Sequence, residues 1–299
     1  MMRFDALRSR YANMLIRDEQ VYPVSLYPKV MSSAPVVRFA DEQESPQHAL
    51  GDLGQAHLKR RLSEDTALTN GETVIWLSGD VSNFVVTTSR YFNMLETCDA
   101  LRAELLSARD DTPVGSLPMR ALAHHLAGDP LFSGAGRSAA VGVSVILSLP
   151  QGDPAEGERA FVIGHRNGSV SLDQGVWHVA PSGMLEPTGE RNCVVNTVVQ
   201  ELAEELGIHL PVQEALKNMR TLGVVHDLTR LRPDLVVRLD LPSEYVPESL
   251  APASEFDAVK LIPVTRNALN EFWPSFTPDH LTPACAGAVA LLELSIDSS

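Results

Sequence analysis

Residues 193–206 (CVVNTVVQELAEEL) constrain the fold more than any other segment, because their apolar residues recur at the spacing of a helix. Four of them are spaced i, i+4, i+7 and i+11, namely Val195, Val199, Leu202 and Leu206. That spacing forms one apolar stripe, which predicts a helix packed against a core. Three glutamates, Glu201, Glu204 and Glu205, fall within an arc of roughly 100° beside the stripe. Since like charges at these spacings repel each other, the glutamates are either solvated or face a positively charged group.

Length and composition indicate a globular chain, and its net charge argues against a nucleic-acid partner. The 299 residues are 44% hydrophobic and 21% charged, enough for one large domain or two ordinary ones. The net charge of −14 argues against binding to a nucleic-acid duplex, which relies on Lys and Arg to neutralise phosphates. A small phosphorylated substrate remains compatible with this charge, because a divalent cation can bridge acidic protein and acidic ligand.

The cysteines and the apolar runs favour a reducing compartment. Cys98, Cys193 and Cys285 are odd in number and widely spaced, which predicts neither a disulfide framework nor a zinc site. The first residues alternate charged and apolar side chains, unlike a secretory signal. The longest weakly polar run, 139–150, is too short to cross a bilayer. We therefore expect a cytoplasmic protein that does not associate with membranes.

A boundary is predicted near residues 109–118, where acids, glycine and two prolines come together. It divides the chain into an N-terminal α+β region, 1–115, whose role the sequence does not indicate, and a second unit, 116–299. In the first unit we expect two strands around Gly79-Asp80, a helix over 91–106, and helix, loop or both over 34–70.

The second unit alternates strands and helices, which indicates α/β or α+β packing. A short helix is expected over 119–128. Two hairpins are predicted, 139–150 with 159–166 and 219–227 with 234–242. Another strand is expected over 257–265, with helices over 266–273 and 286–295.

The stretch PSGMLEPTGERNCVVNTVVQELAEELGI (181–208) resembles the Nudix box, G-x5-E-x7-R-E-U-x-E-E-x-G-U, where U is aliphatic. Gly183 matches the leading glycine and Glu190 the first glutamate. The second half of the box matches position by position, at Glu201, Leu202, Glu204, Glu205, Gly207 and Ile208. The resemblance covers residues 138–296.

The sequence departs from the box at three points. Six residues separate Gly183 from Glu190, one more than in the box, and nine separate Glu190 from position 200, two more than in the box. Position 200 is Gln, where the family has an arginine that holds a catalytic glutamate by ion pairing. Gln200 can donate a hydrogen bond but carries no charge.

The resemblance implies an α/β fold, an α/β/α sandwich around a mixed sheet of the Nudix type, preceded here by the smaller α+β N-terminal region. It implies a pyrophosphohydrolase that uses Mg²⁺ or Mn²⁺ to hydrolyse a nucleoside diphosphate linked to another moiety. Carried over by position, the metal ligands are Glu201, Glu204 and Glu205, with Glu201 or Glu204 doubling as the base. Gly183 would let the backbone approach the metal site.

Other catalytic and substrate-binding residues are predicted from their place in the sequence. Glu255, in a loop before a strand, is the candidate for a further catalytic acid. The residues expected at the substrate are Arg166, Gly183 and Glu190, with Arg166 preferred over four other arginines, Arg220, Arg230, Arg232 and Arg238. His178 and Cys193 are interpreted as packing residues.

Two other functions stay open. One is a non-catalytic module of the same fold that binds a nucleotide-like ligand and regulates a partner, which the N-terminal region and Gln200 favour. The other is isomerisation of a prenyl diphosphate, which would need a catalytic cysteine, and Cys193 is poorly placed for it. The three retained glutamates favour the hydrolase. The sequence also leaves a homodimer open.

Overall fold

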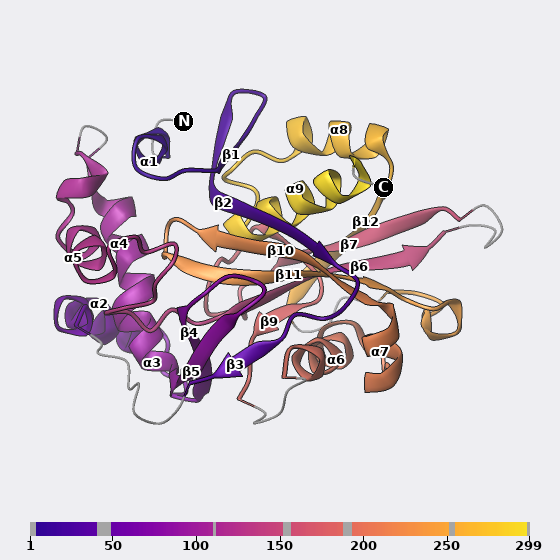
Figure 1. The fold of residues 1–299 in the computed structure, drawn as a ribbon, viewed down its shortest axis with the longest axis horizontal. Coiled ribbons are helices and arrows are strands. Elements are labelled where there is room, and N and C mark those ends of the chain that lie inside the picture. Colours follow the sequence, from indigo (N-terminus) through magenta and orange to yellow (C-terminus); the bar gives the residue numbers. More distant parts are fainter. Residues whose placement is uncertain are drawn as a thin grey trace.

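The computed structural model describes residues 4–40, 49–109, 112–151, 157–187, 193–250 and 255–297 (Figure 1). Its strands are β1 (Met14–Arg17), β2 (Gln20–Met31), β3 (Val37–Phe39), β4 (Glu72–Ser78), β5 (Phe84–Arg90), β6 (Gly142–Pro150), β7 (Arg159–Arg166), β8 (Trp177–Val179), β9 (Ser182–Met184), β10 (Met219–Asp227), β11 (Arg232–Asp240) and β12 (Phe256–Pro263). Its α-helices are α1 (Asp5–Arg8), α2 (Gly51–Glu64), α3 (Tyr91–Met94), α4 (Ala100–Ser107), α5 (Pro118–Ala127), α6 (Cys193–Leu206), α7 (Val212–Asn218), α8 (Arg266–Ser275) and α9 (Pro283–Asp297). A π-helical turn, Leu95–Asp99, joins α3 to α4.

The large sheet is mixed, with strand order β1-β2-β10-β11-β6-β7-β12 and with β8 and β9 pairing β7 and β6. Strands β11 and β6 run parallel, whereas the other neighbouring pairs are antiparallel. Helices α8 and α9 cover one face (Figure 1). Helices α6 and α7 and the small sheet β3-β5-β4 cover the other. The predicted α/β fold, a sandwich of helices around a mixed sheet, is confirmed.

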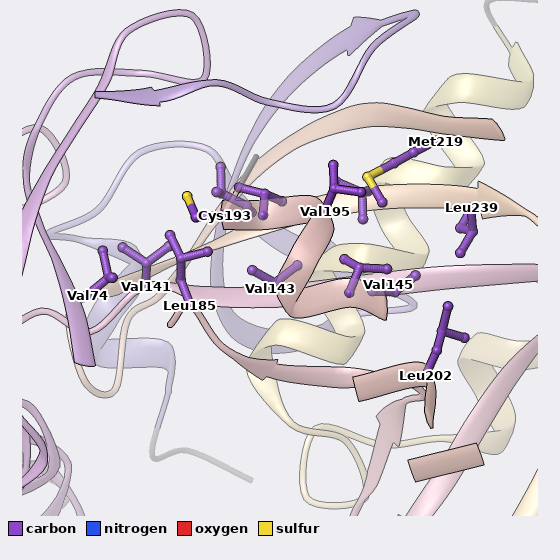
Figure 2. Packing of buried hydrophobic residues seen from close by; sticks show 14 of the residues in the cluster. Val74, Val141, Val143, Val145, Leu185, Cys193, Val195, Leu202, Met219 and Leu239 are labelled. Carbon is purple, nitrogen blue, oxygen red and sulfur yellow. The ribbon is translucent and has the colours of Figure 1, made fainter. Parts of the chain in front are cut away.

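The core on the α6 side explains why the apolar stripe recurs at helical spacing. Val195 and Leu202 pack with Val143 and Val145 of β6 and with Leu239 of β11, as Figure 2 shows. Val199 is only partly buried at the edge of this core. Burial of a Val or Leu side chain stabilises the fold by about 1.5–3 kcal/mol. The stripe therefore fixes the rotation of α6, and with it the direction of each glutamate.

Most elements expected from the sequence are present. The helix over 193–206, both second-unit hairpins and the two strands around Gly79-Asp80 all form. Residues 34–70 contain both strand and helix, β3 and α2. No helix among the described residues is both long and apolar enough to cross a membrane.

The first 31 residues contribute to the large sheet, a feature that the sequence did not reveal. Strand β2 lies between β1 and β10 although it contains Pro23 and Pro28, which lack the N–H that a strand donates. The ladder of β10 shifts register opposite Pro28, at Gly223, where a bulge occurs. The large sheet is therefore not confined to residues 116–299, and the division of the chain at 115/116 stays a prediction.

Backbone hydrogen bonds join the small sheet to the strands that lead into the loop before α6. The amide of Val74 in β4 donates to the carbonyl of Leu185, and the amide of Val141 donates to the carbonyl of Val74. The amide of Trp76 donates to the carbonyl of Ala139. Strand β4 is thus hydrogen-bonded to the segment that precedes α6, so this part of the N-terminal region packs against residues of the second predicted unit.

Candidate functional site

Helix α6 directs its three glutamates into three different environments. Glu205 is buried, Glu201 is partly buried, and Glu204 is exposed. The difference follows from the helical rotation that the core fixes, because each residue of an α-helix is turned by about 100° from the one before it. Glu205 therefore points to the covered side of α6 and Glu204 to solvent, while Glu201 lies between them, close enough to Glu204 for the two charges to interact.

Glu205 is an acid buried without a neutralising cation. Its side chain is 2% exposed, and its Oε2 accepts a hydrogen bond of 3.2 Å from the amide of Ser182. Its Oε1 is buried and has no hydrogen-bond partner in the described part of the chain. Burial, followed by the charges of Glu201 and Glu255, raises the pKa of Glu205 well above 4.5. The fold consequently favours the protonated form of this carboxyl unless a cation compensates its charge.

Glu201 lies one helical turn before Glu205 and contacts the backbone of Gly183. A Cβ atom on Gly183 would overlap the Glu201 carboxylate, so any other residue there would require that carboxylate to move. Burial and the neighbouring charges of Glu204 and Glu255 raise the pKa of Glu201 to about 8. Arg166 opposes this rise without cancelling it.

Glu204 is placed on the solvent side of the helix. Its Oε1 accepts a hydrogen bond of 3.1 Å from Nε2 of Gln200, one turn earlier. Gln200 therefore contacts a glutamate of the helix, but as a neutral donor. The role of Glu204 as ligand or base stays a prediction.

A cavity of about 580 Å³ opens beside Glu201 and Gly183. Arg166 and Glu255 line it, with 4.0 Å between Arg166 Nη2 and Glu255 Oε2. Burial lowers the pKa of Arg166, whereas Glu255 and Glu205 raise it. The structure thus brings together four predicted site residues, Glu201, Gly183, Arg166 and Glu255, at one cavity. Glu190, another predicted site residue, lies outside the described residues.

The two buried carboxylates fit a hard divalent cation. Their oxygens are the ligand type that Mg²⁺ and Mn²⁺ prefer, and Glu205 Oε1 is buried without a partner in the chain described. Among the described residues, no three His, Cys, Asp or Glu side chains gather closely enough to hold a metal ion by themselves. Mg²⁺ usually takes one or two carboxylates and completes its shell with water and substrate phosphate, so two suffice.

His178 also lines the cavity, where it is buried and shares a hydrogen bond of 2.6 Å between Nδ1 and Thr282 Oγ1. Burial, assisted by Arg166 and Arg232, lowers its pKa well below 6.5, so the ring is neutral. Cys193 lies fully buried in the core at the start of α6. Burial raises its pKa to about 11, which leaves the thiol protonated and unsuited to nucleophilic work.

Four lining residues were not assigned to the site from the sequence, Thr73 of β4, Tyr91 of α3, and Arg232 and Asp234 of β11. Arg232 appeared only as one of several arginines near the second hairpin. The others carry no motif, and only the pairing of β4 with Leu185 and of β11 with β6 brings them to the cavity.

No protein-family model and no curated protein matches this sequence. Several solved structures share partial likeness. A MutT/nudix family protein from Enterococcus faecalis is 14% identical over 42% of this chain and 43% of its own, with a TM-score of 0.31. A bifunctional NMN adenylyltransferase/ADP ribose pyrophosphatase from Francisella tularensis, in complex with AMP and a manganese ion, is 16% identical over 52% of this chain and 41% of its own, at 0.34.

The NUDIX domain of Shewanella oneidensis NrtR, in complex with ADP ribose, is 14% identical over 54% of this chain and 90% of its own, with a TM-score of 0.37. This chain therefore spans less than half the length of the first two proteins. With TM-scores below 0.5, these likenesses support no conclusion about an activity or a ligand. The fold rests on the chain's own sheet order and layers.

Proposed function

We propose that this protein is a metal-dependent hydrolase that cleaves a nucleoside diphosphate linked to another moiety. One observation carries the proposal: partly buried Glu201 lines a cavity together with Arg166, buried Glu205 lies one helical turn further along α6, and both acids have raised pKa values. Burying acids without partners is unfavourable, so a cation that binds them gains the free energy that their isolation costs. The likeness of residues 181–208 to the Nudix box supports the same reading.

In this proposal each residue of the chain has a distinct task. Glu201 and Glu205 hold Mg²⁺ or Mn²⁺, while Gly183 leaves space for the Glu201 carboxylate. Arg166 donates to a phosphate oxygen, and Glu255, 46% exposed at the cavity, takes the proton of the attacking water. When bound, the divalent cation would neutralise diphosphate oxygens and acidify that water. The predicted ligand Glu204 would contribute only by moving from its exposed position.

A second candidate is a binding module without catalysis, and two observations favour it. No group of three metal-ligating side chains forms among the described residues. Gln200 also supplies no positive charge to Glu204. In that case the cavity would hold a nucleotide-like ligand and its occupancy would regulate a partner.

The test is hydrolysis of a panel of nucleoside diphosphate derivatives with Mg²⁺ or Mn²⁺. Wild type is compared with Glu201→Gln, which keeps the shape and removes the charge, and with Glu214→Gln as a control at a partly exposed side chain of α7 that does not line the cavity. Turnover that requires metal and collapses only in Glu201→Gln supports the hydrolase. Equal turnover in all three proteins contradicts it, and silence in all three, together with tight nucleotide binding, supports the module.

A further inference from the structure

The cavity has a second polar region beside the wall that the N-terminal region contributes. Three side chains define this distal subsite, Thr73, Arg232 and Asp234. Thr73 belongs to β4, whereas the other two begin β11. Tyr91 also lines the cavity, close enough to Arg232 for that positive charge to act on the pKa of the Tyr91 hydroxyl. The box residues Glu201 and Gly183 line the same cavity, so one ligand can reach both regions.

The distal subsite has unused hydrogen-bonding capacity. Thr73 and Asp234 are 4% and 3% exposed, and neither Thr73 Oγ1 nor Asp234 Oδ2 has a hydrogen-bond partner within the described ranges. Arg232 likewise has two buried groups, Nε and Nη1, without partners there. Each buried polar group that stays unpaired is unfavourable, so a ligand that pairs these groups recovers that free energy.

Asp227 shows by contrast what a satisfied acid in this cavity looks like. Its Oδ1 accepts hydrogen bonds from the amide and hydroxyl of Thr229, and its Oδ2 accepts one from Arg230. It lines the same cavity, but each of its two oxygens already accepts at least one hydrogen bond. Among the described residues that line the cavity, the buried unpaired atoms are therefore concentrated at the distal subsite, with Arg166 Nε as the remaining one.

Charge and polarity together restrict what the distal subsite can bind. Arg232 and Asp234 carry opposite charges and attract each other, which leaves the subsite close to neutral. An anionic group would approach the buried Asp234 carboxyl unfavourably. An apolar group would leave three polar side chains buried and unpaired. A neutral group with several hydroxyls avoids both penalties, because each hydroxyl donates to Asp234 and accepts from Arg232 or Thr73.

We propose that Thr73, Arg232 and Asp234 form a subsite for the hydroxyls of a sugar ring, so that the N-terminal region helps to select the substrate. The inference rests on the proposed function, since it assigns the part of the ligand beyond the diphosphate. The hydroxyls belong either to the ribose of the nucleoside or to a sugar esterified to the second phosphate. Both offer the same chemistry to the subsite.

The wall that carries this subsite is fixed from several sides. Val74, the neighbour of Thr73, is hydrogen-bonded to Leu185 just before the box loop. The loop between β7 and β8 is held by a 2.9 Å hydrogen bond between Tyr91 and Ser171 and by ion pairs from Arg102 and Arg230 to Asp173. A rigid wall of this kind discriminates between ligands because its polar groups cannot turn away from a wrong one.

The test measures equilibrium binding by calorimetry, using three ligands whose methylene-bridged diphosphate cannot be hydrolysed. The ligands are the ADP analogue, its glucose ester, and the 2′,3′-dideoxy form of that ester. We expect wild type to bind the full ester about tenfold more tightly than at least one of the others, as the loss of paired hydroxyls predicts. Weaker binding of the dideoxy form identifies the ribose, and weaker binding of the ADP analogue identifies the second sugar.

Three variants assign that preference to the subsite. In Asp234→Asn and Thr73→Val it should fall below about threefold, whereas Thr73→Ser, which keeps the hydroxyl, should retain it. A wild type without preference, or a preference that survives in both Asp234→Asn and Thr73→Val, overturns the proposal. Should Asp234→Asn fail to fold, Thr73→Val against Thr73→Ser decides alone.

The hydrolysis panel separates this inference from the proposed function. Metal-dependent turnover without any hydroxyl preference would overturn the subsite and leave the hydrolase. A hydroxyl preference without turnover would overturn the hydrolase and leave the subsite, now as part of a binding module.

Discussion

Glu201 and Glu205 on α6 and the ion-pair cluster around Arg230 are both removed from solvent at least in part, but among the described residues only the cluster forms close ion pairs. Arg230 is 1% exposed and pairs with Asp99, Asp173 and Asp227 at 3.1–3.3 Å. Burial alone would raise the pKa of Asp99, but the hydrogen bond with His57 and the charge of Arg230 lower it instead. On α6, Glu201 has its pKa raised because Arg166 compensates too little.

This contrast separates a structural role from a functional one. The Arg230 cluster ties the N-terminal helices and the β7–β8 loop to the end of β10, and its charges need no further partner. Glu201 lines a cavity of about 580 Å³ that a cation and a substrate can reach, and Glu205 lies buried one helical turn further along α6. Raised pKa values of buried acids in a cleft are a known mark of functional sites.

Removing Arg230 should have the largest effect on stability. Arg230→Met removes the buried cation that Asp99, Asp173 and Asp227 share and should lower the free energy of unfolding by about 3–5 kcal/mol, measured by urea denaturation. The control is Arg60→Gln, at a side chain 59% exposed, which should change it by about 0.5 kcal/mol or less. A small effect of Arg230→Met would show that the Arg230 cluster does not have a mainly structural role.

Removing a charge on α6 should affect activity instead. Glu201→Gln should lower kcat/KM by about 100-fold or more, because it takes away a proposed metal ligand while keeping the helix and its core intact. The measurement is steady-state hydrolysis of the best substrate in the panel, with the melting temperature recorded in parallel. If Glu201→Gln lost as much stability as Arg230→Met, Glu201 would have a structural role like that of the Arg230 cluster, which would contradict the comparison.

Removing the charge of Glu205 should stabilise the protein, the opposite sign from Arg230→Met. The folded-state pKa of Glu205 lies above the unfolded value of 4.5, so the folded state binds the proton more tightly. Stability is therefore full below pH 4.5 and is lost as pH rises toward the folded pKa. Glu205→Gln has no such loss, and without divalent cations at pH 8 it should be more stable by about 1–3 kcal/mol. Equal stability of the two proteins from pH 5 to 8 would contradict a buried, uncompensated acid.

The smallest expected effect is a rise of the affinity for Mn²⁺ with pH. Glu201 releases its proton with a pKa of about 8, and the metal competes with that proton. Between pH 6 and 8 the affinity should increase by about tenfold per pH unit if one proton is displaced, which proton release in two buffers can verify. An affinity that is flat over this range would place the ion on groups other than Glu201.

The sequence predicted helix α6 closely because its apolar stripe is local and periodic. It also placed three glutamates beside that stripe, but not their separate environments, which depend on where β9 and Gly183 meet the helix. Periodicity locates an arc on a helix and cannot tell which part of the arc faces a cavity.

The N-terminal contribution to the sheet and the cavity could not be predicted in the same way. Strand β2 carries two prolines, which argue against a central strand, and only the bulge at Gly223 shows how they are accommodated. Thr73 and Asp234 lie far apart in the chain and reach one cavity through long-range strand pairing. No local sequence pattern at either residue predicts that the two line the same cavity.

Calorimetric titration of Mn²⁺ at pH 8.5 tests the central claim most directly, with wild type compared to the double variant Glu201→Gln, Glu205→Gln. The account predicts one binding event in wild type that is absent from the double variant, while the double variant remains folded and at least as stable. Binding of equal strength in both proteins, or no binding in wild type with and without nucleotide, would contradict the claim that these two acids form a cation site.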